Sequence, residues 1–243
     1  MEKNIKEVNE YENEKIYKLS PSALSLMEEC PRCFWLKFNE DKKRQEGIFP
    51  SLPSGMDKIL KKHFDKFMKK GKFPPELAEN KDCENLKLFD DELLLNKWRD
   101  AKKGLWIEDE EGNILHGGID NILINIKNNK LVVLDYKTRG YPLKEDTHKH
   151  YQNQLDVYTF LLKECRYDTE DYAFLLFYVP KEVLETGEVI FDTTLKKIQI
   201  DVENAKAVWK KALDLLRGPC PKKHETINEY GETCAWCRLL NEE

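Results

Sequence analysis

The sequence predicts an α/β fold with a central mixed β-sheet flanked by helices. Apolar residues follow a helical spacing before residue 104 and an alternating spacing, typical of strands, from 104 to 137. After residue 137, the spacing of apolar residues predicts a helix, two strands and a further helix. The chain of 243 residues shows no internal repeat and no low-complexity linker. This order of elements indicates one α/β domain.

Four helices are expected in the first part of the chain. Ser20 is a suitable N-cap and Pro21 a suitable first helical residue, so a helix begins there. Pro31 interrupts this pattern, and a second short helix follows it. Two longer helices are expected at 55–71, which is bounded by glycines, and at 90–104.

Strands dominate the second part. Three strands are expected between 104 and 137, joined by turns at Glu111–Gly112 and Asn128–Asn129. An amphipathic helix covers 147–164, and a buried strand beginning at 171 is expected to end at Pro180. The last regular elements are a strand at 188–200 and a helix at 202–218.

Composition sets limits on the class of protein. Hydrophobic residues make up 40% of the chain and aromatic residues 11%, as in an ordinary folded domain. The net charge of −5 does not by itself indicate a nucleic-acid-binding protein, although a local basic patch matters more for such binding than the net charge. No apolar run could cross a bilayer and no signal peptide is recognisable, so a cytoplasmic location is expected. Residues 1–17 are expected to form a flexible arm, and 18–240 a single domain.

Two acids and a lysine stand out on the predicted strands. Because side chains alternate along a strand, Asp135 and Lys137 lie on one face, roughly 7 Å apart. Asp120 sits on an equally apolar strand face upstream. Burying unpaired carboxylates is unfavourable, and a divalent cation held by oxygen ligands would relieve both acids. Solvated strand ends would explain either acid alone, but the combination favours a metal-assisted phosphodiester hydrolase.

These residues resemble the motifs of the PD-(D/E)XK nuclease superfamily, and within it the RecB-type branch. GGID at 117–120 is similar to the first acidic motif, with Ile119 in place of proline, and LDYKT at 134–138 is similar to the second. Gln154 and Tyr158 match the third motif, Gln-x-x-x-Tyr. The resemblance covers residues 18–240 and extends to a group of short bacterial proteins that carry this endonuclease-like domain alone.

The resemblance implies a restriction-endonuclease-like core and a Mg²⁺- or Mn²⁺-dependent DNA nuclease. Asp120 and Asp135 would bind the metal, and Lys137 would assist the nucleophile. Gln154 and Tyr158, one helical turn apart, would orient a phosphate or the attacking water. The alternative for this pair is a partly buried core aromatic and its neighbour.

Further metal ligands are suggested by the same branch, which often has a histidine on an N-terminal helix shortly after a glycine. Here the candidate is His63, eight residues after Gly55. A histidine on a helix face over the core is the alternative. Without His63, the site would use the two aspartates and the backbone carbonyl of Tyr136.

The cysteines form a second candidate metal site. CPRC and CAWC contribute Cys30, Cys33, Cys234 and Cys237, and two such pairs are typical of a four-thiolate site that clamps the two ends of the chain. Cys220 is a fifth candidate. The spacing fits zinc at least as well as iron–sulfur, and free thiols remain an alternative.

The resemblance favours a [4Fe–4S] cluster over zinc. Several RecB-type nucleases hold one with a single early cysteine and three late ones. That pattern would use Cys30 with Cys220, Cys234 and Cys237, and would leave Cys33 spare.

Basic residues after the second motif are candidates for phosphate contacts. Arg139, Lys144 and Lys149, with His148, lie in this region, although any one of them is as readily a solvated surface residue. Single-stranded DNA or duplex ends are the expected substrates, and protein partners would be those of a repair or defence complex. The alternatives to a DNA nuclease are an RNA-directed nuclease and an inactive nucleic-acid-binding subunit of a larger complex.

Overall fold

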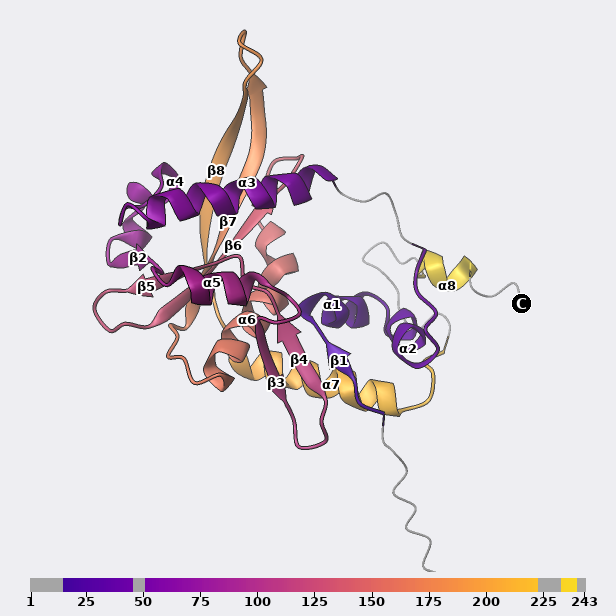
Figure 1. Cartoon of the computed structure of the whole chain (residues 1–243). Coiled ribbons are helices and arrows are strands. Elements are labelled where there is room, and N and C mark those ends of the chain that lie inside the picture. The colour runs from indigo at the N-terminus through magenta and orange to yellow at the C-terminus, as the bar shows by residue number, and fades with distance from the viewer. Residues whose placement is uncertain (1–14, 46–50, 223–232, 240–243) are drawn as a thin grey trace, which may run out of the picture.

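The computed structural model describes residues 15–45, 51–222 and 233–239. It confirms a mixed α/β fold with two β-sheets and surrounding helices (Figure 1). The larger sheet has the strand order β2-β5-β6-β7-β8. Its strands are β2 (Leu86–Leu88), β5 (Asn121–Asn125), β6 (Leu131–Thr138), β7 (Tyr172–Val183) and β8 (Val189–Gln199).

The prediction of three strands between 104 and 137 is wrong, because that stretch forms four, two of which belong to a smaller sheet. Its strand order is β1-β4-β3, with β1 (Lys18–Leu19), β4 (Ile114–Gly117) and β3 (Leu105–Glu108). The predicted middle strand breaks after Gly117 into β4 and β5, which belong to different sheets. The reason lies in the backbone hydrogen bonds: Ile119 N–H donates to the carbonyl of Trp98, and the Asp120 carbonyl accepts from the Arg99 side chain.

The helices largely follow their sequence signals. Ser20 caps α1 by accepting a hydrogen bond from the Ala23 N–H, as its position before Pro21 predicts. The helix predicted at 55–71 begins earlier, at Ser51. The helices are α1 (Pro21–Glu29), α2 (Pro31–Asn39), α3 (Ser51–Met68), α4 (Pro75–Ala78), α5 (Glu92–Arg99), α6 (Gln152–Glu164), α7 (Val202–Arg217) and α8 (Ala235–Leu239), with 3₁₀ turns η1 (Lys81–Cys83) and η2 (Thr147–Tyr151).

Strand β6 is central, which explains its continuous apolar sequence. Residues 131–136 are all buried, because α3 contacts one part of the strand and α6 another. Strands β6 and β7 are parallel, and α6 forms the crossover between them. The strand therefore carries Asp135 into an environment that excludes water.

The hairpin of β7 and β8 shows that the expected end of the strand at Pro180 is wrong. Strand β7 continues through Pro180 to Val183, and the pairing with β8 shifts register between Pro180 and Glu182. A bulge accommodates proline, which has no N–H to donate to the ladder. The hairpin therefore extends well beyond the helices, as the orange ribbon of Figure 1 shows.

The two ends of the described chain meet beside the sheets. Helix α8 lies next to α2, and α7 packs against both α1 and α2 (Figure 1). Of the predicted arm, residues 1–14 fall outside the described residues, whereas Tyr17 is buried and its hydroxyl hydrogen-bonds to Asn39. Among the described helices, none is long and apolar enough to cross a membrane.

Candidate active site and cysteine centre

The two motif acids lie opposite each other on neighbouring strands. In the antiparallel pairing of β5 and β6, Asn121 faces Leu134, and this register places Asp120 across from Asp135 at the end of β5. Asp135 is only 1% exposed. The Tyr136 N–H donates to Oδ2 of Asp120 at 3.2 Å, which fixes that carboxylate at the strand end. The structure thus brings the two acids together.

Lys137 completes the same site. Its Nζ lies 2.5 Å from Oδ2 of Asp135 and donates to Oε1 of Gln154 at 2.8 Å. Nε2 of Gln154 in turn donates to the hydroxyl of Tyr158 at 2.8 Å. The ring of Tyr151 lies 4.8 Å from Nζ of Lys137, a cation–π distance. The motif residues of β6 and α6 therefore form one hydrogen-bonded chain.

Helix α3 adds two residues that the sequence analysis missed. Nζ of Lys61 lies 2.9 Å from Oδ1 of Asp120 and 2.9 Å from the carboxylate of Asp57, one helical turn earlier. The available signal was the pair Asp57 and Lys61, spaced four apart just after Gly55, which puts both on one helix face. The sequence could not predict that this helix face lies over Asp120.

The electrostatics of the site follow from burial. Burial and the nearby Asp120 carboxylate raise the pKa of Asp135 to about 7, although Lys137 opposes the rise. Burial disfavours the charge of Lys61, but Asp120 and Asp57 outweigh it and raise the pKa of this ammonium. Burial and Asp135 also raise the pKa of the Tyr158 phenol, which therefore keeps its proton. Three carboxylates face two lysines in this site.

The residues fit a divalent metal ion. Oδ2 of Asp135 is buried, and its recorded partner is the ammonium of Lys137 at 2.5 Å. Asp57, Asp120 and Asp135 offer carboxylate oxygens, and the Tyr136 carbonyl is a further oxygen close by in sequence. Oxygen donors of this kind suit Mg²⁺ or Mn²⁺. A cation would reduce the repulsion between the acids.

His63, the candidate metal ligand on the same helix, lies elsewhere. Its Nε2 is 3.1 Å from the carboxylate of Glu76, which also accepts a hydrogen bond from the Tyr178 hydroxyl. Two residues along a helix correspond to a turn of about 200°, so the Lys61 face and the His63 face point apart. The structure therefore brings Asp57 and Lys61, not His63, to Asp120.

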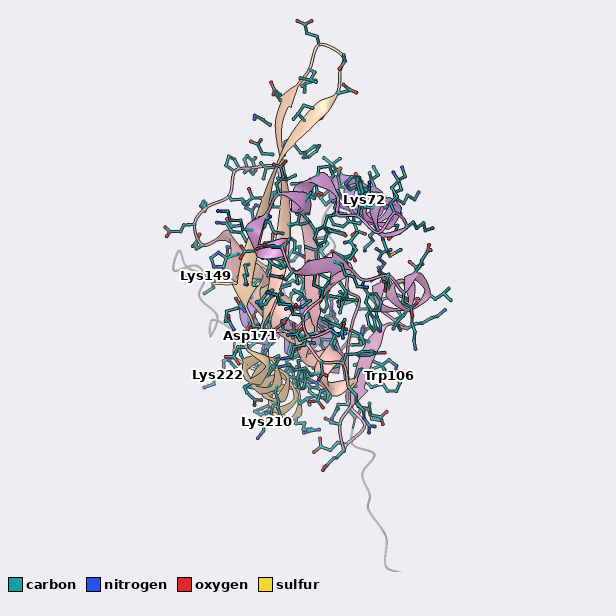
Figure 2. All side chains as sticks on the ribbon, turned by 90° about the vertical axis from the view of Figure 1, so that its left-hand side faces the viewer. Lys72, Trp106, Lys149, Asp171, Lys210 and Lys222 are labelled. Carbon is teal, nitrogen blue, oxygen red and sulfur yellow. The ribbon has the colours of Figure 1, made fainter. Side chains whose placement is uncertain are left out.

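The basic candidates lie in or next to the loop between β6 and α6. Lys144 and Lys149 are exposed, whereas Arg139 is partly buried and its backbone N–H donates to the Tyr178 carbonyl. Figure 2 labels Lys149, whose side chain lies at the surface. Among the described residues, the structure records no contact between these three side chains and the carboxylates of the site.

The second candidate centre consists of four cysteines. The Sγ atoms of Cys30, Cys33, Cys234 and Cys237 all lie within 4.8 Å of one another. Individual separations are 3.4 Å for Cys30–Cys237, 3.5 Å for Cys33–Cys237 and 3.6 Å for Cys33–Cys234. Interactions with Cys33 lower the pKa of Cys30 to about 4, so one thiolate forms readily. This group can hold a metal ion and join α2 to α8.

Cys220 does not belong to this group. The four cysteines that form it therefore differ from the set that the family resemblance implied. Its Sγ lies 3.1 Å from a guanidinium nitrogen of Arg32, which also donates to the Pro221 carbonyl. Cys33 occupies the fourth position instead. The reason is local: Cys30 and Cys33 flank the first turn of α2, so one turn of helix brings both sulfurs to the same side.

Comparison with known proteins identifies the family. The model of the PD-(D/E)XK nuclease superfamily matches residues 18–241. The chain belongs to this superfamily. Membership supports a nuclease-type function, with nucleic acid as the partner and divalent metal ions as typical cofactors. The search of curated proteins finds no match.

A solved structure described as "Crystal structure of SSO0001" is similar at 15% identity. The alignment covers 85% of this chain and 80% of that one, with a TM-score of 0.43.

Proposed function

We propose that this protein is a Mg²⁺- or Mn²⁺-dependent DNA nuclease of the RecB-like type. The observation that carries the proposal is the convergence of Asp120, Asp135 and Lys137 at the ends of two neighbouring strands, with Asp135 buried. Two carboxylates held this close repel each other, as the raised pKa of Asp135 reflects, and a cation between them would relieve that repulsion. Two acids beside a lysine form the arrangement that a metal-assisted hydrolase requires.

Each residue has a separate role in this proposal. Asp120, Asp135 and the Tyr136 carbonyl hold the metal, which supplies Lewis-acid activation of a phosphodiester and of water. Lys137 places its ammonium where negative charge develops on the phosphate oxygens, and the Gln154 amide holds that ammonium in position. Because Tyr158 accepts from Gln154, its own proton is available to donate to a phosphate oxygen.

Asp57 and Lys61 extend the site on the α3 side. Lys61 balances the charge of Asp120 and Asp57, and both carboxylates lie within 2.9 Å of its ammonium. In the proposed function, Asp57 takes the place that the family resemblance gave to His63, and Lys61 contacts the bound phosphate. Arg139, Lys144 and Lys149 bind the backbone of the nucleic acid at the rim.

For the cysteine centre, the geometry favours a single zinc ion over the [4Fe–4S] cluster that the resemblance suggested. Thiolates at 2.3 Å from one tetrahedral ion are about 3.8 Å apart. The separations of 3.4 to 3.6 Å resemble that arrangement. In a four-iron cluster each cysteine binds a different iron, so the sulfurs stand farther apart. Elemental analysis and the absorption spectrum of protein purified without oxygen test this assignment; about four irons per chain and a brown colour would overturn it.

The nuclease proposal is tested with labelled single- and double-stranded DNA and RNA, in Mg²⁺, in Mn²⁺ and without divalent ions. Wild type is compared with Lys137→Ala and Asp120→Ala, and with Lys127→Ala as a control at an exposed lysine that has no role in the proposed site. Metal-dependent DNA cleavage that the first two substitutions abolish and the control retains would support the proposal. DNA binding without cleavage would favour an inactive binding subunit. Cleavage of RNA alone would change the substrate, and cleavage by all variants would refute the site.

A further inference from the structure

A surface next to the proposed active site carries an exposed tryptophan. Trp106 is 51% exposed on β3, although its neighbour Leu105 is buried, because alternate residues of the strand face opposite sides. Trp106 pairs directly with His116 of β4, and Ile114 of β4 pairs with Lys18 of β1. Figure 2 shows Trp106 at the edge of the molecule, on the side away from Lys149.

Two hollows connect this tryptophan with the site. The inner hollow, of about 600 Å³, is lined by Tyr151, Gln154 and Tyr158 among others. The outer hollow, of about 390 Å³, lies on the outward face of the small sheet. Its lining is Lys18, Lys102, Trp106, Glu108, Ile114 and His116. Lys102 and His116 border both hollows, so the surface continues from the motif residues of α6 to Trp106.

His116 and the two glycines after it form the backbone between the hollows. Gly117 and Gly118 line the inner hollow directly after His116. Nδ1 of His116 lies 2.8 Å from the Ala101 carbonyl, which can only accept, so this nitrogen carries the hydrogen. Two lysines against one glutamate give the outer hollow a positive balance.

We infer that the outer hollow binds a single-stranded segment of the nucleic acid whose phosphate lies in the active site, with one base stacked on Trp106. The inference rests on the proposed function. An exposed aromatic ring flanked by lysines is the arrangement by which proteins hold single strands without reading their sequence. Asp120 is four positions after His116, which corresponds to at most about 14 Å of extended chain, or about four stacked nucleotides.

The test measures binding of fluorescein-labelled oligothymidylate, about 12 nucleotides long, by fluorescence anisotropy without divalent ions. Trp106→Ala should weaken binding about tenfold, whereas Trp106→Phe, which keeps a ring, should stay close to wild type. Ile126→Ala is the matched control, because Ile126 is 55% exposed and lines neither hollow. Lys102→Ala should reduce both the affinity and its salt dependence.

An oligonucleotide of the same length without bases separates stacking from a structural effect. Wild type and Trp106→Ala should bind this backbone equally, because there is no base to stack. Equal binding of the normal oligonucleotide by both proteins would overturn the inference and leave the nuclease proposal intact. A loss with Trp106→Ala that persists on the backbone without bases would also overturn it. No binding by wild type would also overturn the inference, and the cleavage assay in Mg²⁺ and Mn²⁺ decides separately on the proposed function.

Discussion

Replacing Asp135 by asparagine is expected to stabilise the metal-free protein while abolishing its proposed activity. The carboxyl is 1% exposed, and burial with Asp120 raises its pKa to about 7 from an ordinary value of 3.8. One pKa unit corresponds to about 1.36 kcal/mol, so the charged form destabilises the fold by about 4 kcal/mol above pH 7. Asparagine has the same shape without the charge. In a domain of this size, the gain corresponds to a rise in Tm of about 10 °C.

The direction of the pKa shift determines how the stability difference between wild type and Asp135→Asn changes with pH. Below pH 3.8 the carboxyl is protonated in both states and contributes no difference. Between pH 3.8 and about 7 the unfolded chain loses its proton first, so the wild-type protein loses stability as the pH rises. The advantage of Asp135→Asn should therefore be small at pH 4.5 and largest near pH 8.

Urea denaturation without divalent ions, followed by circular dichroism at several pH values, measures this difference. Asp156→Asn is the matched control, because Asp156 is also buried but its oxygens accept hydrogen bonds from Gln152, Asn204 and the Asp201 N–H. No comparable gain is expected there. Mg²⁺ should then stabilise wild type more than Asp135→Asn. A variant no more stable than wild type at pH 8, or equally stabilised at pH 4.5, would refute the reasoning.

Three further outcomes are expected. Cys33→Ser should release the bound metal and destabilise the protein, whereas Cys220→Ser should keep the metal content and the stability of wild type. Elemental analysis and thermal denaturation measure the two effects. Equal metal loss in the two variants would contradict the four-cysteine assignment. Gly117→Ala should lower stability by about 1–3 kcal/mol, because a Cβ there would lie 2.8 Å from the Tyr158 ring, and an unchanged Tm would count against this packing. Gln154→Ala should lower kcat roughly 10- to 100-fold with little change in Tm, because the amide positions the motif lysine, and an unchanged kcat would remove that role.

The sequence determined the parts of this protein that depend on neighbours along the chain. Strand alternation put Asp135 and Lys137 on one face, and one helical turn aligned Gln154 with Tyr158. The cap at Ser20 likewise depends on residues next to it, so the beginning of α1 could be predicted.

Only the tertiary structure decided which distant elements meet. The break between β4 and β5 arises because the backbone at Ile119 bonds to the end of α5 and not to a strand. Lys61 reaches Asp120 because α3 lies over the sheet, and Cys30 and Cys33 meet Cys234 and Cys237 because α8 lies next to α2. Such contacts join residues far apart in the sequence, where local periodicity carries no information. Burial, which raises the pKa of Asp135, is likewise a property of the assembled layers and not of the residue.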